Sequence, residues 1–146
     1  MKSTKQKLAL MLVGTSLLGA SVGAVAPAFA GTAYSTVGVF TVSGINYSNQ
    51  AYIITSPGNI SAVSQINSTS GSVAAGWMGA RGRLFNAAGT LIQESQTSYT
   101  SVNATSISVP TVRTGTGTWN SYGVTYSWTG SSYTPYYTFR SPNQTS

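Results

Sequence analysis

Apolar and polar residues alternate in short runs along this chain after residue 30. A period of two residues places successive side chains on opposite faces of a β-strand, so the pattern predicts strands rather than helices. Clusters rich in Gly, Ser, Asn and Pro separate the runs and predict turns or loops. The predicted strands cover residues 33–43, 51–55, 61–66, 76–85, 90–99, 106–112, 122–129 and 133–140.

The composition of residues 31–146 agrees with this pattern. Ser, Thr, Gly, Tyr and Val dominate, and no segment shows the apolar periodicity of an amphipathic helix. Many short strands separated by turns are typical of two packed antiparallel sheets. We therefore expect an all-β fold, a single antiparallel β-sandwich or barrel-like domain of about seven to eight strands.

Two hairpins are predicted in more detail. Between residues 84 and 91, Asn86 favours the start of a turn, and Gly89 suits the left-handed backbone position that closes it. Near the end of the chain, two alternating aromatic runs flank a predicted turn at residues 129–132. Pro135 has no N–H to donate to a neighbouring strand, so its strand is expected to lie at a sheet edge or to bulge at this residue.

Alternation within residues 76–85 separates two faces of one predicted strand. Met78, Ala80 and Leu84 share one face, whereas Arg81 and Arg83 share the other. Trp77 and Phe85 lie on the face of the arginines, so both faces carry apolar residues and either could form the core. Because charged side chains are rarely buried, the conservative solution places the three apolar residues in the core and the two arginines at the surface.

The first thirty residues have the features of an export signal. All three lysines of the chain lie within the first seven residues, and an apolar stretch rich in small residues follows at 8–25. Ala28 and Ala30 then supply the small residues of a cleavage site. We predict a signal peptide over residues 1–30, cleaved after Ala30, and a secreted β-sandwich domain over residues 31–146.

The alternative to cleavage is a retained membrane anchor, because residues 8–30 are long enough to cross a bilayer. Pro27 and the fitting cleavage site favour removal, so stable transmembrane anchoring is not expected. The lysine-rich start and long apolar stretch are typical of bacterial signals, and of Gram-positive more than Gram-negative ones. We therefore expect an extracellular or cell-surface protein of a Gram-positive bacterium.

Charge is scarce in the predicted secreted domain. The whole chain has a formal net charge of +6, but without the three lysines four arginines and one glutamate remain, which gives +3. Nucleic acid is not expected as a partner, because its binding usually requires a larger basic surface. The absence of cysteine excludes disulfide bonds, so packing and backbone pairing must provide stability.

The residue types that carry out most enzymatic chemistry are nearly absent. The chain has no His, Cys or Asp, and Glu94 is its only side-chain carboxylate. A glycosidase normally needs two carboxylates, and a serine nucleophile needs a base. One glutamate also supplies too few ligands for a metal site. We therefore expect a protein that is not an enzyme and has no catalytic residues, metal site or cofactor.

Aromatic residues near the end of the chain are the best candidates for ligand binding. Flat rings with polar tips suit the faces of sugars, peptides or polymers when the rings are exposed. The alternative is that alternate rings fill the core, because few Leu and Ile residues are available to do so. The candidate ligand-binding residues are Trp119, Tyr122, Tyr126, Trp128, Tyr133, Tyr136 and Tyr137.

Arginines provide a second candidate site. Arg81 and Arg83 are the candidate anion-binding residues, with Arg113 and Arg140 as further contributors, because a guanidinium offers forked donors to a phosphate or sulfated glycan. The alternative is that these charges face solvent and keep a strand edge from pairing. An exposed ion pair of Glu94 with Arg81 or Arg83 is worth less than about 1 kcal/mol.

One short motif resembles a known family. Residues 117–119 (Gly-Thr-Trp) followed by residues 122–124 (Tyr-Gly-Val) are similar to a Gly-x-Trp…Tyr-Gly pattern in the lactococcin 972 type of small secreted bacteriocins. In that family the pattern is expected near the start of the secreted protein, whereas here it lies near the end of the chain. The resemblance implies a secreted antibacterial β-protein.

Two functions are compatible with these observations. The first is a secreted, non-catalytic binding or interaction protein, associated with the cell envelope or a glycan or assembling with itself. Its partner would be a cell-wall polymer, a surface protein or a second copy of the chain. The second function is that of a secreted cationic, bacteriocin-like antibacterial protein that acts on membranes or wall precursors.

Overall fold

The structure, a computed structural model, describes residues 30–146. The signal peptide predicted for residues 1–30 lies outside the described residues except for Ala30. Thirteen β-strands and no helix make up the described part of the chain, which confirms the predicted all-β fold. Within residues 30–146, no helix has the length and apolar character needed to cross a membrane.

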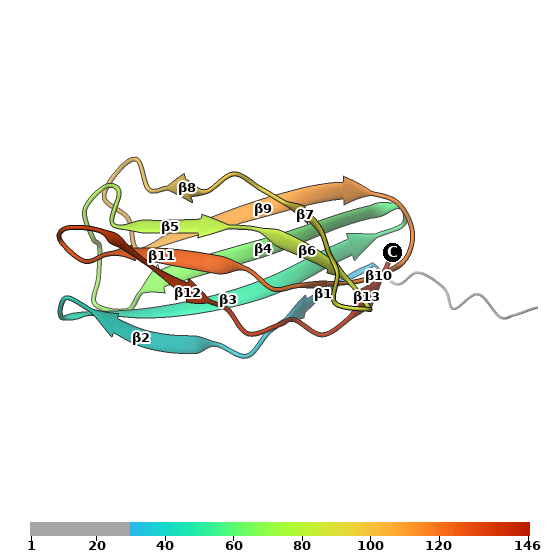
Figure 1. Cartoon of the computed structure of the whole chain (residues 1–146), viewed down its shortest axis with the longest axis horizontal. Helices are drawn as coiled ribbons and strands as arrows, with labels where there is room; N and C mark the ends of the chain where they lie inside the picture. The colour runs from blue at the N-terminus through green and yellow to red at the C-terminus, as the bar shows by residue number, and fades with distance from the viewer. Residues whose placement is uncertain (1–29) are drawn as a thin grey trace, which may run out of the picture.

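The first layer of the molecule is a five-stranded antiparallel sheet. Its two longest strands, β3 (Ile45–Ser56) and β4 (Asn59–Ser68), are joined by a tight turn. β9 (Ser106–Thr114) pairs with the other side of β4, and β1 (Gly31–Tyr34) and β2 (Gly38–Val42) pair one after the other with β3. The long strands run along the long axis of the molecule (Figure 1).

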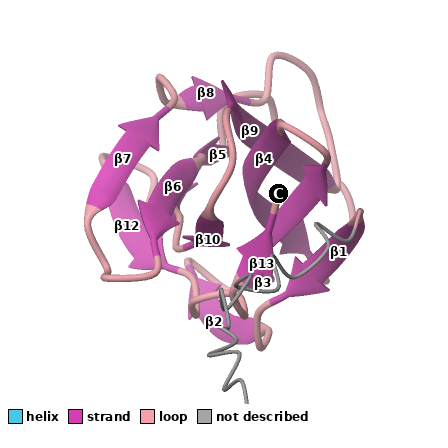
Figure 2. Ribbon diagram, turned by 90° about the vertical axis from the view of Figure 1, so that its right-hand side faces the viewer, coloured by secondary structure: helices cyan, strands magenta, loops and turns pink. Residues whose placement is uncertain are grey.

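The second layer consists of two four-stranded antiparallel sheets placed end to end. They form one layer because β5 (Met78–Arg81) continues into β6 (Arg83–Asn86), and β10 (Thr118–Ser121) continues into β11 (Val124–Trp128). β5 packs across β4 and β9 of the first layer, and the view along the strands shows both layers around a common interior, as in a β-sandwich (Figure 2). The remaining strands are β7 (Leu91–Glu94), β8 (Ser98–Tyr99), β12 (Tyr133–Tyr137) and β13 (Gln144–Thr145).

The second layer comes closest to the first where its two sheets meet. Gly82, between β5 and β6, lies so near the first layer that a Cβ atom would be 2.8 Å from the carbonyl oxygen of Ala62 and the backbone nitrogen of Thr111. Gly123, between β10 and β11, leaves no room for a Cβ atom beside the side chain of Ser64. Glycine is required at such a close approach. We call this contact between the layers the waist.

Side-chain hydroxyl groups replace part of the backbone pairing at the waist. The Oγ atom of Ser95 accepts a hydrogen bond from the backbone N–H of Gly82 at 3.0 Å. The Oγ1 atom of Thr138 accepts one from the backbone N–H of Gly123, also at 3.0 Å. Buried backbone groups need partners, and these hydroxyls supply them where the strands are interrupted.

The waist separates two hydrophobic clusters between the layers. Each cluster contains residues from both layers, so each holds the layers together by burying apolar surface. Cluster A consists of Ala33, Ile53, Ile60, Ala62, Leu84 and Trp119. Cluster B consists of Val42, Tyr47, Ile66, Val73 and Met78.

Both predicted hairpins are present. In the turn between β6 and β7, Gly89 has a φ angle of 84°, and the Oδ1 atom of Asn86 accepts a backbone hydrogen bond. β11 and β12 form the second hairpin, in which the N–H of Thr129 donates to the carbonyl oxygen of Ser132 at 2.8 Å. β12 is an edge strand, as Pro135 predicts.

The predicted faces of the strand that precedes the first hairpin are also confirmed. Met78, Ala80 and Leu84 are fully buried between the layers. Arg81 and Arg83 lie on the outer face, where both remain partly exposed.

The strand prediction differs from the structure in several places. The run predicted as one strand over residues 90–99 forms β7 and β8, which belong to different sheets. The run predicted as one strand over residues 33–43 forms two, β1 and β2, which pair with different parts of β3. The run predicted over 76–85 is interrupted at Gly82 by the waist. The alternation pattern does not predict β10 and β13, because Gly117 and Pro142 next to them favour loops.

Candidate functional site

Seven aromatic side chains share the outer face of the second layer, which we call the aromatic face. On β11, Thr125 and Ser127 are fully buried toward the first layer, so strand alternation places Tyr126 on the outside. On β12, alternation leaves 38% of Tyr133 and 59% of Tyr137 exposed. The aromatic face consists of Phe85, Tyr99, Tyr122, Tyr126, Trp128, Tyr133 and Tyr137.

In one half of the aromatic face, Tyr133 lies at the centre of a group of rings. Its ring centroid is 4.4 Å from that of Tyr99 and 4.9 Å from that of Trp128. Tyr126 packs against Tyr99 with a centroid distance of 6.1 Å. The hydroxyl of Tyr133 donates to the carbonyl oxygen of Gly76 at 2.7 Å. These contacts position the rings before any ligand arrives, which lowers the entropic cost of binding.

Tyr99 is fitted closely onto the strand beneath it. A Cβ atom at Gly79 would overlap the Tyr99 ring, so glycine at this position lets the ring lie against β5. Burial raises the pKa of the Tyr99 hydroxyl above its ordinary value of 10.0; Tyr133 and Tyr126 also raise it, whereas Arg81 lowers it. The hydroxyl therefore keeps its proton at neutral pH and can donate a hydrogen bond to a ligand.

In the other half of the aromatic face, two arginines lie over the same two rings. The guanidinium carbon of Arg83 is 5.0 Å from the centroid of Phe85 and 5.8 Å from that of Tyr122. The guanidinium carbon of Arg140 is 5.1 and 5.2 Å from these centroids. Tyr137 stacks on Tyr122 with a centroid distance of 5.8 Å. We call Arg83 and Arg140 the arginine pair; both make cation–π contacts.

A buried asparagine holds Arg140 in place. Asn120 is only 2% exposed, and its Oδ1 atom accepts a hydrogen bond from Nη1 of Arg140 at 2.9 Å. The amide nitrogen of Asn120 donates to Oδ1 of Asn143 at 2.9 Å and to the carbonyl oxygen of Asn86 at 3.4 Å. Because Asn120 is itself fixed on both sides, the guanidinium of Arg140 has a defined position over the rings.

Glu94 lies between two arginines on this face. Its Oε1 atom is 3.4 Å from Nη1 of Arg81, and its Oε2 atom is 3.6 Å from Nε of Arg83. The register explains the second contact, since Arg83 and Glu94 are Cα partners. Both ion pairs are partly exposed, so each contributes less than about 1 kcal/mol to stability. Arg81 and Arg83 thus share one carboxylate, and with Arg140 this face carries net positive charge.

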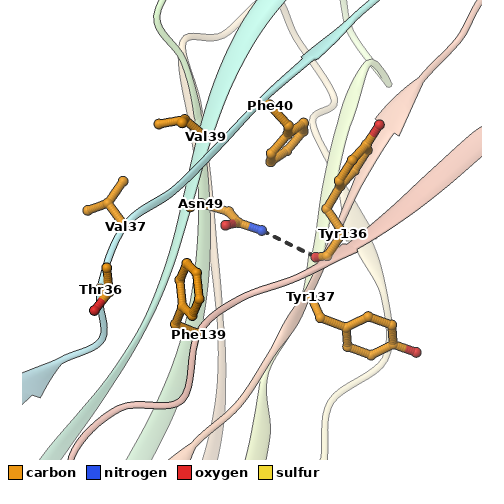
Figure 3. A pocket seen from close by; sticks show the side chains of 9 residues that line it. Thr36, Val37, Val39, Phe40, Asn49, Tyr136, Tyr137 and Phe139 are labelled. Carbon is orange, nitrogen blue, oxygen red and sulfur yellow. Dashed lines mark hydrogen bonds between the residues drawn. The ribbon is translucent and has the colours of Figure 1, made fainter.

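A groove of about 460 Å³ adjoins the aromatic face at Tyr137 (Figure 3). It lies between β2 and β12, which are both edge strands. Phe40 and Tyr136 stack there with ring centroids 3.8 Å apart, and the side-chain amide of Asn49 donates to the carbonyl oxygen of Tyr136 at 3.3 Å. The groove is lined by Thr36, Val37, Gly38, Val39, Phe40, Asn49, Tyr136, Tyr137 and Phe139. A smaller pocket of about 130 Å³ is lined by Ala75, Gly76, Trp77, Trp128 and Tyr133.

The structure brings together five of the seven aromatic residues singled out from the sequence, and it places the other two elsewhere. Trp119 is 9% exposed and belongs to cluster A, between the layers. Tyr136 faces the first layer and stacks on Phe40. Strand parity is the signal that separates them, because Tyr136 directly precedes the outward-facing Tyr137 and Trp119 is three residues from Tyr122. The five residues on the aromatic face are Tyr122, Tyr126, Trp128, Tyr133 and Tyr137.

Two rings of this surface are not identified from the sequence, and Arg140 is named there only as a further contributor beside Arg81 and Arg83. Phe85 and Tyr99 lie outside the aromatic-rich C-terminal segment, and only the pairing of β6 with β10 and of β5 with β8 brings them to it. Arg140 takes the place beside Arg83 that the sequence suggests for Arg81. Parity places Phe85 on the same side as Arg83, but the sequence contains no signal for the approach of Arg140.

Comparisons of the chain with protein-family models, with curated proteins and with solved structures gave no match. The residues that resemble the lactococcin 972 pattern have packing roles in this fold, since Trp119 lies in cluster A and Gly123 at the waist. In residues 30–146, no group of three or more His, Cys, Asp or Glu side chains is placed to hold a metal ion. The candidate site therefore offers rings, hydroxyl groups and guanidinium groups.

Proposed function

We propose that this protein is a secreted, non-catalytic binding protein that holds a polysaccharide on the aromatic face. The observation that carries the proposal is the gathering of seven rings on one open sheet face, with Tyr99, Tyr133 and Tyr137 each 38% exposed or more. Aromatic side chains contribute strongly to binding when a ligand covers them, and a contiguous exposed apolar surface is typical of an interaction site.

The chemistry of the aromatic face favours sugar rings as its ligand. A sugar ring has a flat face of C–H groups and a rim of hydroxyl groups, and tyrosine and tryptophan present a flat apolar ring with a polar tip. Tyr99 and Tyr133 provide both in neighbouring positions. The rings extend over both sheets of the second layer rather than lining a closed pocket, which favours a long chain over a small molecule.

Binding without hydrolysis follows from the acids available. Glu94 is the only side-chain carboxylate in the sequence, and it lies between Arg81 and Arg83. Hydrolysis of a glycosidic bond normally requires a second carboxylic acid on the other side of the bond. We therefore assign the protein a role in attachment to a polysaccharide.

The test is retention of the purified protein on insoluble peptidoglycan, chitin and cellulose, with Trp128→Ala and Tyr137→Ala as variants. Each variant should lower the affinity for the retained polymer by about tenfold or more, because buried aromatic anchors dominate binding energy. Tyr34→Ala is the matched control: Tyr34 is 57% exposed, close to the 59% of Tyr137, but it lies on the first layer. This control should bind like the unmodified protein.

Two results would contradict the proposal. One is equal loss of retention in Tyr34→Ala and Tyr137→Ala, and the other is no retention on any polysaccharide. Leakage of dye from anionic liposomes would favour the bacteriocin-like function that is the alternative from the sequence. Melting curves of all variants should coincide within a few degrees, since the substituted rings are partly exposed.

A further inference from the structure

The arginine pair is an unusual arrangement because two like charges lie over the same two rings. Arg83 lies on β6, and Arg140 lies in the segment between β12 and β13, yet both guanidinium carbons are within 5.1 Å of the Phe85 ring centroid. Like charges at such a site repel each other unless an opposite charge is near. Glu94 is the one carboxylate on this face, and it is shared with Arg81.

The arginine pair has hydrogen-bond donors available for a ligand at its terminal nitrogens. The Nε atom of Arg83 is buried and lies 3.6 Å from Oε2 of Glu94, so a ligand would reach the terminal nitrogens of this side chain instead. Arg140 uses Nη1 to donate to Asn120, which orients the group. A guanidinium has five N–H donors in a rigid plane, so a ligand can occupy several of the others.

We propose that the arginine pair binds an oxyanion, a carboxylate or a phosphate ester, carried by the polysaccharide on the aromatic face. The inference rests on the proposed function and narrows it, because it makes the ligand an acidic polysaccharide. Two guanidinium groups match the oxygens of such an anion through forked, charge-assisted hydrogen bonds. Tyr122 and Tyr137, stacked next to the pair, provide the rings for the sugar that carries the anion.

Arg113 provides an internal comparison for the same chemistry. Its guanidinium carbon is 5.8 Å from the ring of Trp119, so it also makes a cation–π contact. It lies on β9 of the first layer, whereas the arginine pair lies on the second, and within residues 30–146 no second arginine makes a cation–π contact with its ring. An anion that is attracted by positive charge alone should bind at Arg113 as readily as at Arg140.

The experiment is a titration of the purified protein with inorganic phosphate and with glucuronate, with glucose as the neutral control, followed by the NMR signals of the arginine Nε–H groups. The sequence contains four arginines, so each signal can be assigned by substitution. The signals of Arg83 and Arg140 should shift together and saturate with both anions, whereas that of Arg113 should stay in place. Shifts of equal size for all four arginines, or no shift for any, would overturn the proposal.

Substitutions test the pairing of the two arginines. Arg140→Gln should weaken the affinity for glucuronate, measured from the Arg83 signal, by about tenfold, which is the scale expected for one charge-assisted contact. Arg113→Gln changes the net charge by the same amount and should leave that response unchanged. Arg140→Lys keeps the charge and loses the fork, so its affinity should fall between those of Arg140→Gln and the unmodified protein. If Arg113→Gln weakens the response as much as Arg140→Gln, the pair has no special role.

Two further ligands identify the source of the anion. A uronate oligosaccharide should bind more tightly than glucuronate, and more tightly than an oligothymidylate of the same charge. Tighter binding of the oligothymidylate would assign the arginine pair to nucleic acid and overturn this inference. Failure of the proposed function gives a different result from failure of this inference. If the aromatic face does not hold the polysaccharide, Tyr137→Ala will bind the uronate oligosaccharide as well as the unmodified protein does, even where phosphate still shifts the arginine signals.

Discussion

The two layers of this sandwich are built from similar alternating strands but differ in shape and in outer surface. In the first layer β3 and β4 run without interruption, and outward-facing positions on β4 and β9 are largely uncharged and polar, such as Gln65, Asn67 and Ser108. The second layer is interrupted at the waist, and its outer surface carries the aromatic face and the arginine pair. Under the proposed function, the first layer would serve as the scaffold and the second as the binding surface.

The largest expected effect is a loss of stability that differs between the inner and the outer side of the second layer. Trp119→Ala should lower the free energy of unfolding by about 4 kcal/mol, because it removes a large buried side chain from cluster A. Trp128→Ala should cost only about 1 kcal/mol, since Trp128 is half-buried on the outer face and contacts Tyr133 edge-on. Denaturant unfolding measures both values. Similar losses for the two variants would mean that the outer rings are as structural as the inner ones.

The next effect concerns the shape of the second layer. Gly82→Ala should lower the free energy of unfolding by about 3 kcal/mol, because the new Cβ atom would press on the backbone of the first layer and force the layers apart. Gly89→Ala is the matched control, since its Cβ atom would meet nothing within 4 Å. Its positive φ of 84° alone should cost about 1 kcal/mol. Equal melting temperatures of the two variants would contradict a close contact at the waist.

The smallest effect concerns the inner surface of the first layer and has the opposite sign. Tyr47 is 1% exposed and its hydroxyl has no hydrogen-bond partner among the described residues, so Tyr47→Phe should raise the free energy of unfolding by about 1 kcal/mol. Ser121→Ala is the control. The Ser121 hydroxyl is also buried, but it donates to the carbonyl oxygen of Val63 at 3.2 Å, so its removal should destabilise the protein.

The same residue gives a dependence on pH. Burial raises the pKa of the Tyr47 hydroxyl above its ordinary value of 10.0, so the unfolded chain loses this proton at a lower pH than the folded chain. Ionisation of Tyr47 therefore does not reduce the free energy of unfolding below about pH 10, and reduces it as the pH rises above that value. Unfolding curves at pH 9 to 11 should show a smaller alkaline loss of stability in Tyr47→Phe. An unchanged alkaline loss would show that Tyr47 ionises as easily in the folded chain.

Local patterns in the sequence predict most strands of the fold and part of the candidate site. Alternation is enough to place Met78, Ala80 and Leu84 in the core, and Asn86 and Gly89 identify a turn from local preferences alone. The waist is not predictable in this way, because the need for glycine at 82 and 123 arises from the opposite layer. For the same reason the approach of Arg140 to Arg83 depends on contacts between segments far apart in the chain.

The waist also affects which core substitutions the protein can accept in evolution. Cluster A and cluster B have no residue in common, and Gly82 and Gly123 lie against the first layer where the two sheets of the second layer meet. Substitutions without shared partners have additive effects on stability, whereas neighbours within one cluster are coupled. Each cluster can therefore be repacked in evolution without compensating changes in the other, provided that both glycines are kept. The sandwich behaves as two separately adjustable halves.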